Sequence, residues 1–340
     1  MAESHLTLVL PPLILADTEA EQFASSLAQA QGSLPGLRKA ISRGDRERFS
    51  NQSVALCHLF GFDFDNLHDI PVATLRASGN GFDSSTGYWL CADPVHLHPD
   101  LDHVVLFDKQ HFKLSANELS HLVEGIKELL VDSGIETWIG HDLSLYFRLE
   151  DIPAVNFTPL SEVVGKNILP YLPEGEDAAK WTLLSNEIQM QLTQNKVNEQ
   201  REHEGEVAIN GLWFWGGGFL LPKRYDRQFD TVMSDDVFIK GLANFRDISL
   251  ASTQKHFSDI ALERKTLVCA GTNSESPEEY LKTLLEVEQN WLSPALAALK
   301  KKQLGSLTLF SGNMRISLNR KSLGRFWKRT PTAKELLAWL

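Results

Sequence analysis

The sequence predicts an α/β fold, and three observations favour it. Residues 7–10 form an apolar run typical of a buried strand, and residues 19–31 follow with apolar side chains at helical spacing. The same alternation returns toward the other end, where strand-like runs at residues 265–269 and 306–310 flank a helical pattern at residues 278–302. With 340 residues, of which 43% are hydrophobic, the chain has enough apolar side chains for one large core or two moderate ones.

The first third of the chain continues with helical patterns. Residues 34–43 have apolar side chains at helical spacing, and Gly44 marks the end of this helix. Residues 51–62 form a shorter pattern of the same kind, which ends at Gly61. We therefore expect two more helices in this region.

Residues 88–114 change character, because short strand-like runs alternate with Asp-Pro and Pro-Asp turns. This pattern predicts a hairpin or a meander. A helix then begins at Ser115, whose spacing to Glu118 is that of a capping box, and we expect it to run to about Asp132.

The middle of the chain predicts a strand, a long loop and a long helix. The strand covers residues 143–149, and a loop rich in proline and glycine covers residues 153–175. Apolar residues at the spacing of one buried face predict a helix over residues 178–204. Residues 207–214 then form a β-rich run that leads into three glycines, and residues 236–245 form a further helix.

Composition and charge argue against several classes of protein. The three cysteines, Cys57, Cys91 and Cys269, lie far apart without a CxxC pair, which argues against a zinc ribbon or a disulfide framework and favours a cytoplasmic location. The net charge of -11 disfavours nucleic-acid binding by the whole surface. The longest apolar run, residues 6–16, is interrupted by two prolines and too short to span a bilayer, so we expect no membrane association.

Several segments carry a resemblance to a known family. Residues 209–218 read Ile-Asn-Gly-Leu-Trp-Phe-Trp-Gly-Gly-Gly, which is similar to the Asn-x-x-Trp-x-Trp-Gly-x-Gly signature of the archaeal-type cofactor-independent phosphoglycerate mutases. Residues 165–175, 197–205 and 53–63 resemble three other stretches of that family. Residues 88–97 resemble more closely a bacterial group, the RpfE-type regulatory proteins.

The resemblance implies a fold and its division into domains. It implies an alkaline-phosphatase-like α/β/α sandwich core with an inserted smaller α+β domain. We place the discontinuous core domain at residues 1–73 and 207–340 and the inserted mutase-type domain at residues 74–206.

The same resemblance implies that the metal-binding residues of the mutases are missing. In the family, two divalent ions and a serine nucleophile move the phosphoryl group. The first metal carboxylate falls on Pro12, and the later metal-binding stretches fall on residues 269–280 and 312–313, which supply no matching ligands. The family's serine falls on Gln52, so Ser53 is only a weak catalytic candidate. We therefore expect no metal site and no cofactor.

The candidate ligand-binding residues come from the resemblance and from the glycine run. Arg201 and Asn198 match substrate-side residues of the family, whereas the arginine of another family stretch falls on Cys91. Consecutive amides of a glycine run can cradle an anion, although a tight turn after a buried strand explains the same run. The candidates in and before this run are Asn210, Trp213, Gly216, Gly217 and Gly218.

Two further clusters each have a functional and a structural interpretation. Four histidines lack a recognised ligand spacing, so we expect them on the surface rather than at a metal: His96, His98, His103 and His111. Residues 315–334 carry basic and no acidic residues beside two aromatic rings. That segment is typical of a surface for nucleic acid or an acidic partner, or of the exposed face of a C-terminal helix, which we favour. Its basic residues are Arg315, Arg320, Lys321, Arg325, Lys328, Arg329 and Lys334.

Three functions follow from these observations. The first, which we favour, is a non-catalytic mutase-like protein that binds a small anionic or phosphorylated metabolite, or a protein partner, in a regulatory role. The second is a mutase-like phosphotransferase or hydrolase with relocated catalytic residues. The third is a nucleic-acid-associated regulator that uses the basic segment. Metal content distinguishes the second function from the others, and salt-dependent binding to nucleic acid marks the third.

Overall fold

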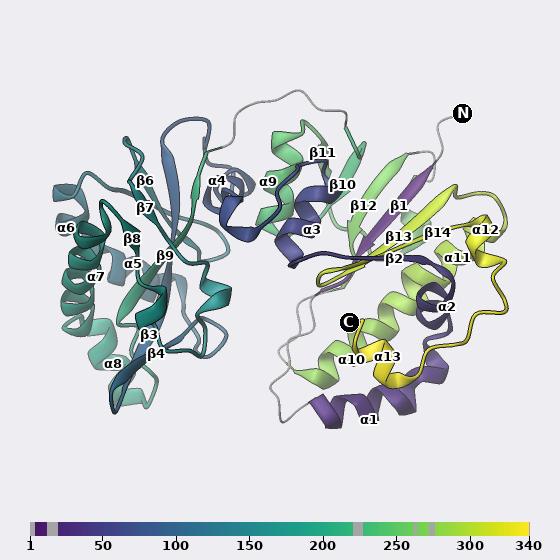
Figure 1. The fold of residues 1–340 in the computed structure, drawn as a ribbon, viewed down its shortest axis with the longest axis horizontal. Helices are drawn as coiled ribbons and strands as arrows, with labels where there is room; N and C mark the ends of the chain where they lie inside the picture. Colours follow the sequence, from purple (N-terminus) through teal and green to yellow (C-terminus); the bar gives the residue numbers. More distant parts are fainter. Residues whose placement is uncertain (1–3, 12–19, 220–226, 262–263, 272–275, 340) are drawn as a thin grey trace. The chain divides into compact units, whose positions relative to one another are not determined.

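The computed structural model describes residues 4–11, 20–219, 227–261, 264–271 and 276–339 (Figure 1). The chain divides into two compact units. The first contains residues 1–66 and 224–340, and the second contains residues 67–223. Each unit has its own sheet and its own hydrophobic core.

The first unit is built on a seven-stranded sheet with the order β11-β10-β12-β1-β13-β14-β2. The strands from β11 to β13 are parallel, and β14 and β2 continue the sheet with antiparallel pairing. Their bounds are β1 (His5–Val9), β2 (Asp45–Arg48), β10 (Thr231–Met233), β11 (Ser249–Ala251), β12 (Lys265–Cys269), β13 (Ser306–Ser311) and β14 (Met314–Asn319). Successive residues of β1, from Leu6 to Val9, are all buried, so the centre of the sheet is covered on both faces.

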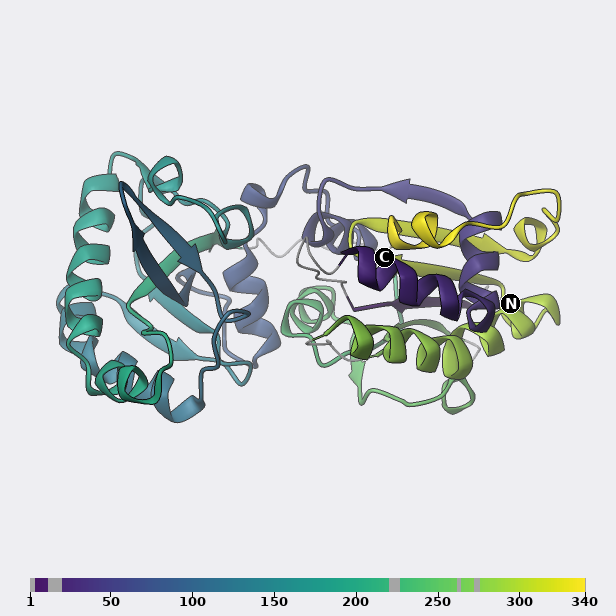
Figure 2. The same ribbon diagram turned by 90° about the horizontal axis from the view of Figure 1, so that it is seen from below.

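Helices surround this sheet, and Figure 2 shows the purple α1 beside the green α10. The two helices meet where the rings of Phe23 and Tyr280 pack edge to face, with centroids 6.0 Å apart. The buried Glu288 carboxylate accepts hydrogen bonds from the amides of Gly36 and Leu37 at the start of α2, at 2.8 and 2.9 Å. The helical elements are α1 (Ala20–Ala30), η1 (Gln31–Ser33), α2 (Pro35–Arg43), α3 (Gln52–Leu59), α9 (Val237–Phe245), η5 (Phe257–Asp259), α10 (Pro277–Val287), the π-helical η6 (Glu288–Leu292), α11 (Ser293–Lys300), α12 (Arg320–Leu323) and α13 (Ala333–Leu337).

The second unit is an antiparallel sheet with helices (Figure 1). Its central strand is β3, which pairs with β6 and β4 along one edge and with β9 along the other. The strands are β3 (Tyr88–Asp100), β4 (His103–Phe107), β5 (Glu136–Ile139), β6 (Leu145–Leu149), β7 (Val155–Asn156), β8 (Glu174–Gly175) and β9 (Gly211–Gly218). The helical elements are η2 (Leu67–Asp69), α4 (Val72–Gly79), α5 (Ala116–Gly125), α6 (Lys127–Asp132), η3 (Leu160–Glu162), η4 (Leu169–Tyr171), α7 (Ala178–Thr193) and α8 (Lys196–Glu204).

The Asp-Pro turn that we predicted near residue 93 is wrong, because β3 runs through it as one strand of 13 residues. Pro94 lies between the segment of β3 that pairs with β6 and the segment that pairs with β4. At this position β3 pairs only with β9, opposite Leu212. A proline is tolerated there because no second neighbouring strand needs its missing amide.

Two predicted helices are divided in the structure. The capping box of Ser115 and Glu118 is confirmed, but the helix is interrupted at Ile126 between α5 and α6. The long helix over residues 178–204 is interrupted at Asn195, whose side chain accepts a hydrogen bond from the amide of Val197 and caps α8.

The compact units do not begin and end at the domain boundaries that we predicted, 73/74 and 206/207. Along the chain, the boundaries between the two compact units lie at residues 66/67 and 223/224. The reason for the second difference is β9, which pairs with β3 and therefore belongs to the sheet of the second unit. Within the described residues, no helix is long and apolar enough to cross a bilayer.

Candidate functional site

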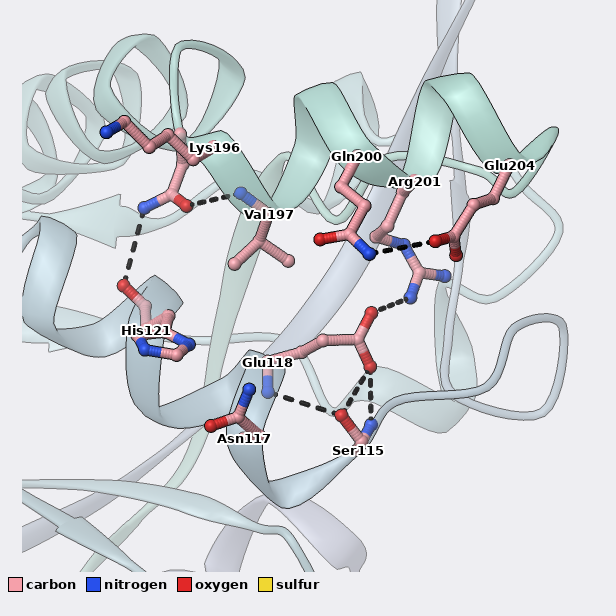
Figure 3. Close-up of a pocket in the computed structure, with 10 residues that line it drawn as sticks. Ser115, Asn117, Glu118, His121, Lys196, Val197, Gln200, Arg201 and Glu204 are labelled. Carbon is pink, nitrogen blue, oxygen red and sulfur yellow. Dashed lines mark hydrogen bonds and ion pairs between the residues drawn. The ribbon is translucent and has the colours of Figure 1, made fainter.

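A polar pocket of about 670 Å³ lies between α5 and α8 of the second unit (Figure 3). Its lining includes Arg201, which the resemblance assigns to ligand binding, together with Glu118 and Glu204. This pocket is therefore the candidate site.

Arg201 is 4% exposed, and its guanidinium joins three parts of the second unit. Nη1 donates to the Glu118 carboxylate at 2.6 Å and to the Lys113 carbonyl at 3.0 Å. Nε donates to the Val207 carbonyl at 2.7 Å. Arg201 therefore fastens α8 to the start of α5 and to the segment that leads into β9.

The Glu118 carboxylate is held from two sides, as Figure 3 shows. One oxygen accepts from Arg201, and the other accepts from the amide and hydroxyl of Ser115 at 2.8 and 2.7 Å. Partial burial disfavours the charged carboxylate, but the hydrogen bonds from Ser115 and Arg201 prevail and hold the pKa of Glu118 below its ordinary value. Glu118 is thus a fixed anion that completes both the capping box and the Arg201 pair.

The rest of the lining mixes both signs of charge. Lys196 contributes a cation, and the Glu204 carboxylate accepts a hydrogen bond from the Gln200 amide at 2.8 Å. The Asn195 amide donates to the carbonyl of His121 across the pocket at 3.4 Å. The pocket can therefore hold polar groups, but it is not a purely cationic cradle for phosphate.

Asn198 and Asn210 bind backbone in this structure. Asn198 donates to the carbonyls of Leu192 and Ile209 and accepts from the Ile209 amide, at 2.8 to 2.9 Å. Asn210 accepts from the Leu97 amide at 2.7 Å and donates to the Leu97 carbonyl at 3.0 Å. Both side-chain amides therefore hold neighbouring backbone segments together by hydrogen bonds. Their part in ligand binding stays a prediction.

The three glycines lie at the end of β9, where neighbouring atoms approach closely. A Cβ atom added to Gly217 would lie 2.2 Å from the Tyr88 hydroxyl, and one added to Gly218 would lie 2.8 Å from Pro71 Cβ. Gly216 has a positive φ of 64°. These contacts give a packing reason for the glycine run, and the anion cradle stays a prediction.

The remaining candidates lie elsewhere. The Trp213 indole donates to the Thr158 carbonyl at 2.9 Å and lines a separate cavity, described below. Ser53 lies in the first turn of α3 in the first unit. Pro12, on which the missing metal carboxylate falls, lies outside the described residues, as does part of the stretch of residues 269–280.

No group of three or more His, Cys, Asp or Glu side chains able to hold a metal occurs among the described residues. His103 contacts Asp102 and His111 contacts Asp108, each at 2.9 Å.

The basic segment does not form the C-terminal helix that we predicted. It runs from β14 through α12 toward α13, because residues 314–319 pair with both β13 and β2. Three of its basic residues form ion pairs: Arg315 with Glu47, Arg325 with Asp45 and Arg329 with Glu335. These carboxylates reduce the charge that the segment could offer to nucleic acid.

A buried polar cluster around Arg76 was not predicted from the sequence. The guanidinium lies 3.2 Å from Asp142 and 3.8 Å from Asp93. It also lies 3.9 Å from the Cys91 thiol, at the position where the family resemblance implies an arginine. Burial raises the pKa of Cys91 to about 12, although the nearby Arg76 acts in the opposite direction. No local spacing reveals this cluster, because its members come from α4, β3 and the loop before β6.

No family model matches the chain. It is 27% identical over 126 residues to a probable 2,3-bisphosphoglycerate-independent phosphoglycerate mutase of Geobacter sulfurreducens, a match that covers 36% of this chain and 31% of that protein. It is 26% identical over 181 residues to the 2,3-bisphosphoglycerate-independent phosphoglycerate mutase of Methanosarcina mazei, covering 49% of this chain and 44% of that enzyme. The chain thus has a distant sequence relationship to these mutases and spans less than half the length of either.

Two solved structures are similar over most of the chain. The PH0037 protein from Pyrococcus horikoshii has a TM-score of 0.54 at 11% identity and matches 93% of this chain and 87% of its own. A cofactor-independent phosphoglycerate mutase from Thermoplasma acidophilum has a TM-score of 0.49 at 13% identity, with coverage of 99% and 98%. The predicted fold class, an α/β core with an inserted smaller α+β part, is confirmed.

Proposed function

We propose that this chain is a phosphoglycerate mutase-like protein of the RpfE type that does not transfer phosphoryl groups. It acts in the bacterial cytoplasm, in a regulatory role, by binding a small anionic metabolite or a protein partner. Its domains are the discontinuous core and the inserted domain that the resemblance implies.

The observation that carries this proposal is the engagement of Arg201. A phosphate is gripped best by a guanidinium that offers two parallel N–H groups. Here Arg201 already donates to the Glu118 carboxylate and to the carbonyls of Lys113 and Val207. A phosphorylated substrate would have to displace a carboxylate that Ser115 also holds in place. Nη2 is buried and makes no hydrogen bond with any residue that the structure describes. With Nη1 and Nε engaged, however, Arg201 has no pair of parallel N–H groups to offer, which favours a structural role over a mutase reaction.

Cys91 gives further support. A buried thiol with its pKa raised to about 12 is uncharged at neutral pH and cannot replace the arginine that the resemblance places there. The neighbouring Arg76 is itself committed to Asp93 and Asp142. A ligand would therefore be recognised by other groups than those of a mutase.

The test measures metal content and turnover on the same preparation. Purified protein is incubated with manganese or zinc, freed of excess ion and examined by elemental analysis, and 2-phosphoglycerate formation from 3-phosphoglycerate is followed by ³¹P NMR. The Geobacter sulfurreducens relative serves as the comparison protein. We expect that this chain retains neither metal ion and forms no 2-phosphoglycerate. Near-stoichiometric retention of two ions together with product formation would overturn the proposal.

The binding part of the proposal has its own measurement. Calorimetric titration of the metal-free protein with 3-phosphoglycerate and 2-phosphoglycerate tests the anionic class directly. Saturable binding without turnover supports a metabolite sensor, whereas no heat with either compound leaves the protein partner as the regulatory ligand to be sought by cross-linking in cells.

A further inference from the structure

A second cavity of the second unit, of about 240 Å³, is separate from the polar pocket. Four consecutive residues of β9, residues 211–214, contribute to its lining. Within the described chain, β9 pairs only with β3, so its other edge is free of a neighbouring strand. The cavity lies beside β9, and residues of α7, residues of the segment 157–173, Leu97 of β3 and Val104 of β4 complete its wall.

One wall of this cavity is aromatic and firmly packed. Phe157 and Phe214 both line it and contact each other at 6.2 Å between ring centroids. Trp181 lies against both rings, with centroid distances of 5.0 and 5.1 Å. Trp213 points to the opposite face of β9 from Phe214 and lines the cavity from another side, where its indole donates a hydrogen bond to the Thr158 carbonyl. Such a preformed wall favours a flat apolar ligand, because little side-chain freedom is lost on binding.

A polar part of the lining belongs to α7. Ser185, Asn186 and Gln189 line the cavity from successive turns of this helix. Among the described residues, these three side chains form no hydrogen bond that would occupy their hydroxyl or amide groups. They are therefore available to a polar substituent of a ligand.

Charge and size narrow the ligand class. The lining of this cavity contains no Asp, Glu, Lys or Arg among the residues that the structure describes. An ion would lose its hydration there without gaining a counter-ion, so the cavity disfavours charged ligands. A volume of about 240 Å³ exceeds the ~150 Å³ that holds one benzene ring and lies below the usual range for drug-sized ligands.

We propose that this cavity is a binding site for an uncharged single-ring aromatic molecule with one hydrogen-bonding substituent. The ring lies against Phe157 and Phe214, and the substituent reaches the Gln189 amide. The site does not depend on the proposed function, because it shares no lining residue with the Arg201 pocket.

The experiment uses the full chain and two fluorinated probes of nearly equal shape. Binding of 4-fluorobenzyl alcohol and of the charged 4-fluorobenzoate is measured by ligand-observed ¹⁹F NMR. We expect saturable binding of the alcohol and at least about tenfold weaker binding of the carboxylate, since the carboxylate finds no counter-ion. Equal affinity for the two probes, or no saturable binding of the alcohol, would overturn the proposal.

Variants locate the binding. Ser185→Phe fills the cavity and should abolish binding, whereas Met190→Phe adds the same ring to an exposed position of α7 outside the lining and should leave binding unchanged. Gln189→Leu keeps the side-chain size but removes the amide, so we expect binding about five- to tenfold weaker. Circular dichroism and cooperative thermal unfolding establish that each variant folds. If Ser185→Phe does not fold, Gln189→Leu decides, and unchanged affinity in that variant contradicts the proposed site.

Discussion

Arg76 is the residue whose replacement should damage the second unit most directly. Its buried guanidinium neutralises Asp93 and Asp142, and Trp215 donates to Asp93 as well, at 2.6 Å. Arg76→Met leaves two carboxylates without a counter-ion, so we expect a loss of about 3–5 kcal/mol in the free energy of unfolding. Urea denaturation measures this loss. Arg148→Met removes a more exposed ion pair with Glu136 and should cost at most about 1 kcal/mol; an equal loss in both variants would contradict the assignment.

His5 makes the first unit sensitive to pH. Burial, reinforced by Lys265 and Arg315, lowers the pKa of His5 from 6.5 to about 4. Its ring nitrogens contact the hydroxyls of Ser306 and Thr7 at 2.7 and 3.0 Å. The unfolded chain protonates His5 more readily than the folded chain does. The contribution of His5 to the free energy of unfolding is therefore fully present above pH 6.5 and is lost as the pH drops from 6.5 toward 4.

We expect the free energy of unfolding to differ between pH 7.5 and pH 5 in part because of His5. Urea denaturation measures the free energy of unfolding of the wild type at the two pH values, and His5 should contribute on the order of 1–2 kcal/mol to the difference between them. In His5→Gln this difference should shrink by that amount, because glutamine does not titrate. His121→Gln replaces an exposed histidine and should leave the difference unchanged. A pH dependence of His5→Gln equal to that of the wild type would show that His5 does not carry the effect.

At the scale of elements, the end of β9 depends on its glycines. Gly218 has φ 152° and little space beside Pro71, whereas Gly205 has φ 77° and open space. Both changes to alanine incur backbone strain, which is greater at the more extreme φ of Gly218, and Gly218→Ala adds the close contact with Pro71. We expect Gly218→Ala to lose about 1–3 kcal/mol more than Gly205→Ala, as judged by thermal and urea unfolding. Similar losses would indicate that α4 and its flanking turn adjust to the added methyl group.

The elements also show what sequence patterns capture. Strands β12 and β13 and helices α1, α2 and α9 were predicted within a few residues, because buried apolar spacing dominates their sequences. Strand β2 was missed because its residues, Asp-Arg-Glu-Arg, are all exposed at the edge of the sheet. The division between α7 and α8 was missed because residues 196–204 are nearly all polar, so no apolar spacing marks where a new helix begins after the Asn195 cap. Edge strands and caps depend on neighbours and single side chains that periodicity does not record.

Of the residues that line the candidate pocket, the sequence predicted only Arg201 as a ligand-binding residue. The family motif identified Arg201, Asn198, Asn210 and Trp213, yet nothing in the motif indicates that Glu118 neutralises the arginine. Glu118 precedes Arg201 by 83 residues, and the two meet only after α5 and α8 have packed. The Arg76 cluster and the apolar cavity likewise arise from contacts between distant segments. Local patterns therefore identify candidates, and tertiary packing determines which atoms remain available.

At the scale of the whole molecule, the second unit should fold without the first. Residues 67–223 are contiguous and enclose their own sheet and core. Strand β9 is essential to this unit, because it pairs with β3 and places Leu212 and Phe214 in the core. We expect the fragment of residues 67–223 to unfold cooperatively and to give dispersed amide signals in ¹⁵N–¹H NMR. A fragment of residues 67–206 lacks β9 and should give collapsed spectra and no cooperative transition, since half of β3 would lose its partner and the core would lose Ile209, Leu212 and Phe214. A cooperative fold in the shorter fragment would instead support a domain boundary at 206/207 and assign β9 a peripheral role.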